Sequence, residues 1–336
     1  MQMHDPRPDR ILEIGYAFWK SKVLLSAVEF GLFTVLAPGP LTLDQLVSTL
    51  KLAERGARDF FDSLVSLNLL VRDQHGRYSN SPESACYLNR RSNLYIGGAL
   101  ERLNSGGYEP WAGLATALRS GKPWNTRLAR GYNALHSDRQ ASDAFLKGMT
   151  GGVLLPARAL AQKFPWSEHR TVTDVGSAQG CCLVEIARVH AHIVGCGFDL
   201  PPVAPFFREY VREQNLSERL RFCPGDFFTD PLPKADVLVI GRVLHNWDLP
   251  TKKMLLQKAY AALPVGGKLV VYETLIDDDR CHHVHALLQS LNMLVMTKGG
   301  FDFTAADCAG WLADVGFRQC DVEPLACDHF MIVSTK

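Results

Sequence analysis

The pattern of apolar positions changes near Pro165. After this residue, short apolar runs alternate with amphipathic segments, which is typical of a parallel sheet covered by helices. The spacing predicts a doubly wound α/β domain with helices over 183–189 and 306–315. The predicted strands cover 171–175, 193–198, 220–223, 235–240, 268–272, 318–323 and 330–335.

Before Pro165 the apolar residues recur at helical spacing. The stretch 11–36 predicts two amphipathic helices, with Gly15 and Gly31 as interruptions. A short helix is expected to begin at 41–46 and a longer one to cover 55–70. The alternation over 70–78 around a glycine predicts a hairpin. Two helices followed by a hairpin have the outline of a winged helix.

A winged helix raises the possibility of a DNA-binding regulator. A recognition helix needs a basic, polar face, but the helix over 55–70 pairs Arg55 and Arg58 with Asp59 and Asp62, and apolar residues form most of its surface. These features favour packing or dimerisation over insertion into a DNA groove.

The stretch 92–165 is again helical in pattern, with breaks expected at Gly106-Gly107, Pro110, Gly121 and Gly151-Gly152. One helix is expected to end at Met149, which then either fills a core or faces a cleft. We therefore expect a winged-helix-like domain over 1–105, a helical linker that contributes to the substrate pocket over 106–165, and a ligand-binding domain over 166–336.

Composition excludes several classes of partner. The 336 residues carry 36 Lys+Arg and 35 Asp+Glu, so no global field favours nucleic acid or an anionic membrane. Residues 1–9 lack a basic region followed by an apolar stretch, so we expect no secretory signal there, and no apolar run has the length of a membrane span. The nine cysteines, Cys196 and Cys223 among them, suit free thiols in a reducing compartment. We expect a cytoplasmic protein.

A small-residue turn follows the first strand of the second half. Asp174 and Gly176 begin this turn and Gly180 ends it, directly before a helix, so a ligand can approach the backbone closely. Asp199 lies 19 residues after Gly180 (199 − 180), the spacing of a carboxylate that binds ribose hydroxyls. Asp199 can equally cap the turn before Pro201.

The ligand expected at this turn contains a ribose but is not a nucleotide bound through its phosphates. The turn lacks both the glycine fingerprint of dinucleotide sites and the Gly-Lys-Ser/Thr sequence of phosphate-binding loops. S-adenosylmethionine has no phosphate, and its positive groups suit carboxylates such as Asp174, Asp199 and Asp226. In addition, Asp226 can accept a hydrogen bond from an adenine amino group while Phe227 stacks on the ring.

One segment fixes the expected reaction. Residues 235–248 end in His245-Asn246-Trp247-Asp248; Gly225-Asp226-Phe227-Phe228 comes before and Gly266-Gly267 after. This arrangement resembles the small-molecule O-methyltransferases that include plant caffeic acid enzymes, the animal hydroxyindole enzyme and bacterial antibiotic-tailoring enzymes. The resemblance implies a Rossmann-like S-adenosylmethionine domain behind a winged-helix-like dimerisation domain, a homodimer and a small aromatic substrate.

The resemblance also implies roles for individual residues. His245 matches the general base, and Glu273 and Asp302 match its acidic partners. Cofactor binding is expected at Asp174, Gly176, Gly180, Asp199, Leu200, Gly225, Asp226, Phe227 and Arg242. Substrate contacts are expected at Met149, Asn246, Asn292, Met293 and Met296, the two methionines Met149 and Met293 clamping a flat acceptor.

The sequence departs from the family pattern at several positions. Ser177 and Ala178 replace glycines in the turn, Asp302 replaces a glutamate, and Asn246 replaces an aspartate beside the base. The run Cys281-His282-His283-Val284-His285 has metal-ligand residue types, but the acidic residues before it favour a solvated loop, and we expect no metal. Transfer to carbon or nitrogen, or a reaction without methyl transfer, remains an alternative.

Overall fold

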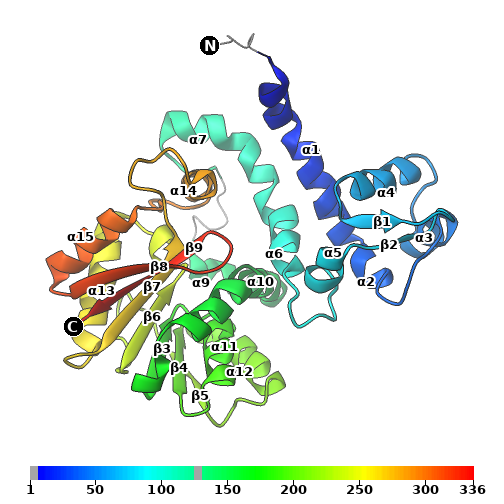
Figure 1. The fold of residues 1–336 in the computed structure, drawn as a ribbon. Coiled ribbons are helices and arrows are strands. Elements are labelled where there is room, and N and C mark those ends of the chain that lie inside the picture. The colour runs from blue at the N-terminus through cyan, green and yellow to red at the C-terminus, as the bar shows by residue number, and fades with distance from the viewer. Residues whose placement is uncertain (1–6, 125–130) are drawn as a thin grey trace, which may run out of the picture. The chain divides into compact units, whose positions relative to one another are not determined.

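The computed structural model describes residues 7–124 and 131–336, without the side chains of residues 133 and 134 (Figure 1). The chain divides into two compact units between Gly107 and Tyr108. The further division of the second unit at residue 165 stays a prediction.

The first unit is mainly helical, with one two-stranded ribbon. Its elements are α1 (Asp9–Glu29), α2 (Leu32–Val35), α3 (Leu43–Leu50), α4 (Ala57–Ser66), β1 (Leu70–Arg72), β2 (Tyr78–Asn80), α5 (Pro82–Tyr87), α6 (Gly97–Arg102) and the π-helical turn η1 (Leu103–Gly107). Gly31 separates α1 from α2 with a φ of 67°, as expected. Gly15 lies inside α1, so the predicted interruption there is wrong; one helical glycine costs only about 1 kcal/mol.

Helix α4 packs into the core of its own unit. Phe61 and Leu64 are fully buried beside Tyr78 of the ribbon. Asp62 accepts hydrogen bonds from the Tyr78 hydroxyl at 2.7 Å and from Arg72 Nη1 at 2.6 Å, which ties the helix to both strands. The expectation that this helix uses its apolar face for packing is confirmed.

The second unit contains a seven-stranded sheet between two layers of helices. The strands are β3 (Thr171–Val175), β4 (Val194–Asp199), β5 (Leu220–Pro224), β6 (Val237–Gly241), β7 (Lys268–Thr274), β8 (Arg318–Pro324) and β9 (His329–Thr335). The α-helices are α7 (Leu114–Ser120), α9 (Tyr132–Leu135), α10 (Arg139–Lys163), α11 (Cys181–Val189), α12 (Ala204–Glu213), α13 (Leu249–Ala262), α14 (Val284–Met296) and α15 (Ala305–Val315). Short 3₁₀ turns are η2 (Glu109–Gly113), η3 (Trp166–Glu168), η4 (Pro201–Val203) and η5 (Leu244–Asn246).

The strand order is β5-β4-β3-β6-β7-β9-β8, with only β9 antiparallel to both of its neighbours. Successive residues of β6 alternate between two cores: Val237 and Val239 pack with α10 and α11, whereas Leu238 and Ile240 pack with α13 and α15. The predicted α/β fold with all seven strands is confirmed. The order reverses at β3, where ligands of such sheets bind.

Helix α10 corrects one expectation. It continues from Arg139 to Lys163 through Gly151-Gly152 and Pro156, so it neither ends at Met149 nor breaks at the glycine pair. Gly151, Ala157 and Leu160 are buried along it, and the helix packs on α11. The free energy gained from this burial exceeds the local cost of the glycines.

The cysteines give a second correction. Cys196 of β4 and Cys223 of β5 are joined by a disulfide, so these two positions do not carry the free thiols expected. The strands are hydrogen-bonded neighbours, and their register places Cys223 opposite Phe198, two residues beyond Cys196 on the same face. The remaining cysteines are free. Within the described residues, no helix is long and apolar enough to cross a bilayer.

Candidate active site

The carboxyl ends of the parallel strands carry most of the candidate residues. After β3 the chain turns at Gly176, where φ is +75° and the backbone N–H donates to Phe198 O at 2.8 Å. A Cβ atom at this position would lie 2.6 Å from Cγ2 of Val243. Gly180, with φ +87°, ends the turn as the N-cap of α11. Both glycines are therefore required by the backbone itself.

Asp199, at the end of β4, is bound to this turn. Its Oδ2 accepts from the backbone N–H of Ala178 at 2.8 Å and its Oδ1 from that of Leu200 at 2.7 Å. Burial nevertheless raises the pKa of Asp199 to about 6. Burial and the charge of Asp199 together raise the pKa of Asp174 to about 7. A cation held beside these two carboxyl groups would favour their ionised forms.

The loop after β5 supplies an aromatic wall. The Gly225 N–H donates to Asp199 O at 3.0 Å, and Oδ1 of Asp226 accepts from the Phe228 N–H at 2.9 Å. The rings of Phe227 and Phe228 meet the ring of Trp247 edge-on, with centroids 5.7 and 5.0 Å away. These contacts place an acceptor oxygen and flat apolar surfaces in one loop.

His245 lies in η5, directly after β6, with 4% of its surface exposed. Its Nδ1 is 3.3 Å from Oδ1 of Asp302 and 3.6 Å from Oε2 of Glu273, and its backbone N–H donates to Oε1 of Glu273 at 3.3 Å. Two carboxylates beside Nδ1 favour the tautomer that carries its proton there. Nε2 then keeps a lone pair and can accept a proton.

The two acidic residues are held by separate contacts. Asp302 Oδ1 accepts from the Thr274 hydroxyl at 3.2 Å, and the Asp302 N–H donates to the Ser290 hydroxyl at 3.1 Å. Although aspartate is shorter than the glutamate usual in the family, Asp302 reaches the imidazole of His245 directly, at 3.3 Å. Burial raises the pKa of Glu273, while His245 and Arg242 act against this shift.

Arg242 lies close to the same carboxylates. It has a positive φ of 56°, and its Nη1 is 3.2 Å from the Thr274 hydroxyl and 3.9 Å from Oε2 of Glu273. The guanidinium thus partly compensates a buried negative charge. Its expected contact with the methionine carboxylate of the cofactor stays a prediction.

The candidate substrate residues come from three elements. Asn292, Met293 and Met296 lie on α14, where both methionines are buried and Asn292 Oδ1 accepts from Trp111 Nε1 at 3.0 Å. Met149 lies on α10, and Asn246 donates to the backbone carbonyls of Arg242 and Val243. Asn246 therefore has a local structural role. A methionine clamp around an acceptor stays a prediction.

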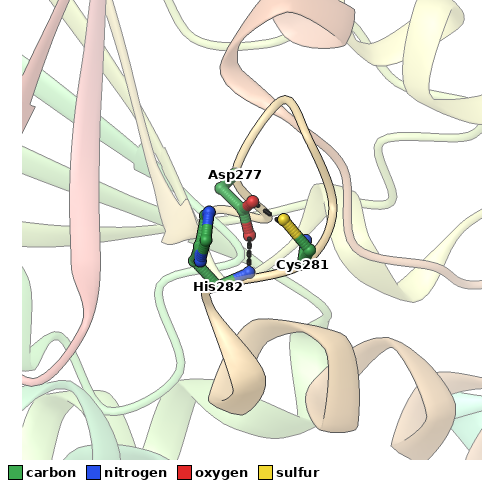
Figure 2. Close-up of side chains that lie close together, drawn as sticks. All are labelled: Asp277, Cys281 and His282. Atoms are coloured by element: carbon green, nitrogen blue, oxygen red, sulfur yellow. Dashed lines mark hydrogen bonds between the residues drawn. The ribbon is translucent and has the colours of Figure 1, made fainter. Parts of the chain in front are cut away.

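The loop between β7 and α14 contains a group of side chains of the types that bind metals. Figure 2 shows the Asp277 carboxylate turned toward Cys281 and His282, and one donor atom from each lies within 4.8 Å of the others. The carboxylate already accepts the backbone N–H groups of Cys281, His282 and His283. These bonds lower the pKa of Asp277 and organise an exposed loop. The absence of a metal stays a prediction.

Several residues of the site were missed in the sequence. Lys252 and Lys258 of α13 donate to backbone carbonyls around the site, and Thr274 and Trp111 hold Asp302 and Asn292. No local signal marks them, because a lysine on an amphipathic helix usually faces solvent. Their roles follow only from the tertiary arrangement.

Comparison with known families now adds to this geometry. Residues 111–318 match the family model described as an O-methyltransferase domain, and residues 12–90 match the O-methyltransferase dimerisation domain. The chain belongs to the O-methyltransferase family. It is an S-adenosylmethionine-dependent methyltransferase of the family's class II type.

Relatives of this methyltransferase align over nearly its whole length. The tetracenomycin polyketide synthesis 8-O-methyl transferase of Streptomyces glaucescens is 39% identical over 94% of this chain and 93% of its own. The N,N-dimethyltransferase OxyT of Streptomyces rimosus is 36% identical over 93% and 91%. The structure of human N-acetylserotonin methyltransferase in complex with SAM superposes with a TM-score of 0.92 at 27% identity, covering 100% and 99% of the chains.

The elevated pKa of Asp174 predicts how stability depends on pH. The folded pKa of about 7 lies above the ordinary 3.8, so ionisation of Asp174 destabilises the folded state. Asp174 does not reduce stability below about pH 3.8; the loss of stability grows as the pH rises and is complete above about pH 7. In the cofactor-free methyltransferase, Asp174→Asn should raise the free energy of unfolding by on the order of 1 to 3 kcal/mol near pH 8. Urea unfolding measures this gain, which should shrink near pH 5. An equal gain at both pH values would contradict the assignment.

Proposed function

We propose that this methyltransferase moves the methyl group of S-adenosylmethionine to a hydroxyl oxygen of a small aromatic acceptor, with His245 as the general base. The observation that carries the proposal is the buried imidazole of His245, whose Nδ1 faces Asp302 and Glu273. The base lies at the end of β6, the strand next to the glycine turn after β3.

The cofactor site is proposed along the ends of β3, β4 and β5. Gly176, Gly180 and Gly225 lie in the loops at these strand ends, where a Cβ would lie less than 3 Å from a neighbouring side chain, so the close packing there requires glycine. Asp199 and Leu200 would receive the ribose, and Asp226 and Phe227 the adenine. Asp174 and Arg242 would lie toward the methionine end. The raised pKa of Asp174 supports this assignment, since the sulfonium and the ammonium of the methionine part supply the missing positive charge.

Bound S-adenosylmethionine supplies an activated methyl group on a positively charged sulfur. The residues of this chain then have to hold the acceptor in line and remove its proton. A free phenol has a pKa near 10, so its ionisation at pH 7 costs about 4 kcal/mol. His245 Nε2 takes this proton, and the carboxylates of Glu273 and Asp302 stabilise the imidazolium that results.

The aromatic acceptor is supported by the pocket candidates and by a relative. Met149, Met293 and Met296 offer polarizable apolar contacts to a flat ring, and Asn246 and Asn292 offer polar ones. The 3-hydroxy-5-methyl-1-naphthoate 3-O-methyltransferase of Streptomyces sahachiroi is 31% identical over 93% of this chain. The name of this relative describes transfer to an aromatic hydroxyl.

Nitrogen is the second candidate acceptor, since one relative is an N,N-dimethyltransferase at 36% identity. A panel of matched phenols and arylamines, assayed with labelled S-adenosylmethionine and analysed by mass spectrometry, separates the two. Products methylated only on oxygen support the proposal. Products methylated only on nitrogen contradict it.

The general-base role is tested by His245→Gln. The variant should bind S-adenosylmethionine with unchanged affinity and lower kcat by on the order of 10² to 10⁴, because only the proton transfer is removed. Calorimetry and steady-state kinetics with a phenol provide the two measurements. Wild-type turnover in the variant would remove His245 as the base.

The ribose contact is tested by Asp199→Ala. We expect the dissociation constant of S-adenosylmethionine, measured by calorimetry, to rise at least about ten-fold, because a hydrogen bond to a charged group contributes about 1.5 to 3 kcal/mol. Since Asp199 also binds the turn, circular dichroism and thermal unfolding serve as controls for folding. Unchanged affinity in the folded variant rejects the contact.

A homodimer through the first unit is proposed from the dimerisation-domain match and from α1. The N-terminal half of this helix leaves Ile11, Ile14 and Trp19 between 58 and 74% exposed, an apolar surface of the kind that mediates association. Light scattering should give a dimer for the wild type. The double substitution Ile14→Glu and Trp19→Glu should shift it to monomer; a wild type that is monomeric at micromolar concentration contradicts the proposal.

A further inference from the structure

Lys252, on the first turns of α13, is a buried lysine that the proposed chemistry does not use. Its exposed surface is 0%. Its Nζ donates to Trp247 O at 2.6 Å and to Phe301 O at 3.0 Å, and it lies 3.2 Å from the centroid of the Phe301 ring. Full burial of an ammonium is costly and rare, so these contacts must offset a large desolvation penalty.

The two carbonyls belong to the two segments that build the base. Trp247 follows His245 by two residues, and Phe301 directly precedes Asp302. The segments are closely packed, since a Cβ at Gly300 would lie 2.5 Å from the carbonyl oxygen of His245. One ammonium therefore joins the chain beside the imidazole to the chain beside its carboxylate.

We infer that Lys252 is a positioning residue that fixes the imidazole of His245 against Asp302, through its hydrogen bonds to Trp247 O and Phe301 O. The inference rests on the proposed role of His245 as base. Without the ammonium, both carbonyls lose their buried donor, and the two segments can move apart. A displacement of about 1 Å at a reacting group can cost on the order of 10² in rate.

Two other lysines of α13 provide matched controls. Lys258 Nζ donates to Phe227 O at 2.6 Å and Asp230 O at 2.9 Å, so it holds the loop proposed for the adenine. Lys253 pairs with Asp314 on the surface, with 38% of its side chain exposed. The same helix thus carries one lysine for the base, one for the cofactor loop and one facing solvent.

The test compares Lys252→Met, Lys258→Met and Lys253→Met by kcat, KM and calorimetric affinity for S-adenosylmethionine. Lys252→Met should lower kcat about 10- to 100-fold and leave the cofactor affinity within about three-fold. Lys258→Met should weaken the binding of S-adenosylmethionine, and Lys253→Met should resemble the wild type in all three quantities. Two results overturn the inference: a wild-type kcat in Lys252→Met, or a loss of affinity for S-adenosylmethionine as large as the loss of kcat.

A double-mutant cycle with His245→Gln tests whether Lys252 acts through the base. In the His245→Gln background, Lys252→Met should change kcat little, because no base remains to be positioned. An undiminished loss in both backgrounds identifies a general structural role and overturns the inference. Full activity of His245→Gln alone is a different result, since it removes the proposed function itself.

Lys252→Arg keeps a cationic donor and carries the cycle if Lys252→Met does not fold. Its larger head does not reproduce both contacts, so kcat should fall below that of the wild type, with unchanged cofactor affinity and little further loss beside His245→Gln. Equal losses of kcat in both backgrounds overturn the inference with this variant as well.

Discussion

The imidazole of His245, enclosed with two buried carboxylates, is the constraint that the surrounding structure has to satisfy. Glu273 and Asp302 are almost fully buried, and negative charge in such a place needs donors or a cation. Thr274, Arg242 and the His245 backbone supply them, and the ammonium of Lys252 also interacts with both carboxylates, although burial lowers its pKa to about 8. The imidazole completes this set. Its protonation during the reaction would add a positive charge that compensates the negative charges of the two carboxylates.

The fold brings these groups together from distant parts of the sequence. His245 follows β6 and Glu273 lies near the end of the adjacent parallel strand β7, while Asp302 lies in the segment between α14 and α15. A short parallel bridge between Ile276 and Thr304 extends the edge of β7 and places Asp302 beside it. The glycine turn after β3 is on the other side of β6, so the proposed cofactor and base sites share one edge of the sheet.

The sequence predicted the strands well because parallel strands buried on both faces are continuous apolar runs, as in residues 237–240. It failed at Gly151-Gly152, where local helix propensity gave the wrong answer and burial of α10 decided. The Cys196–Cys223 disulfide depends on strand register, which no local pattern specifies. Lys252 was missed for a related reason: its neighbours along α13 do not reveal that Trp247 O and Phe301 O meet at its ammonium.

The most direct test of the base is how its importance depends on the acidity of the acceptor. Single-turnover rates of the wild type and His245→Gln can be compared over a series of phenols with pKa values from about 10 to below about 6, at pH 7 and saturating S-adenosylmethionine. A general base matters only while the phenol is protonated. The ratio of the two rates should therefore fall from on the order of 10² toward unity as the phenol becomes more acidic. A ratio that stays constant across the series would contradict the account.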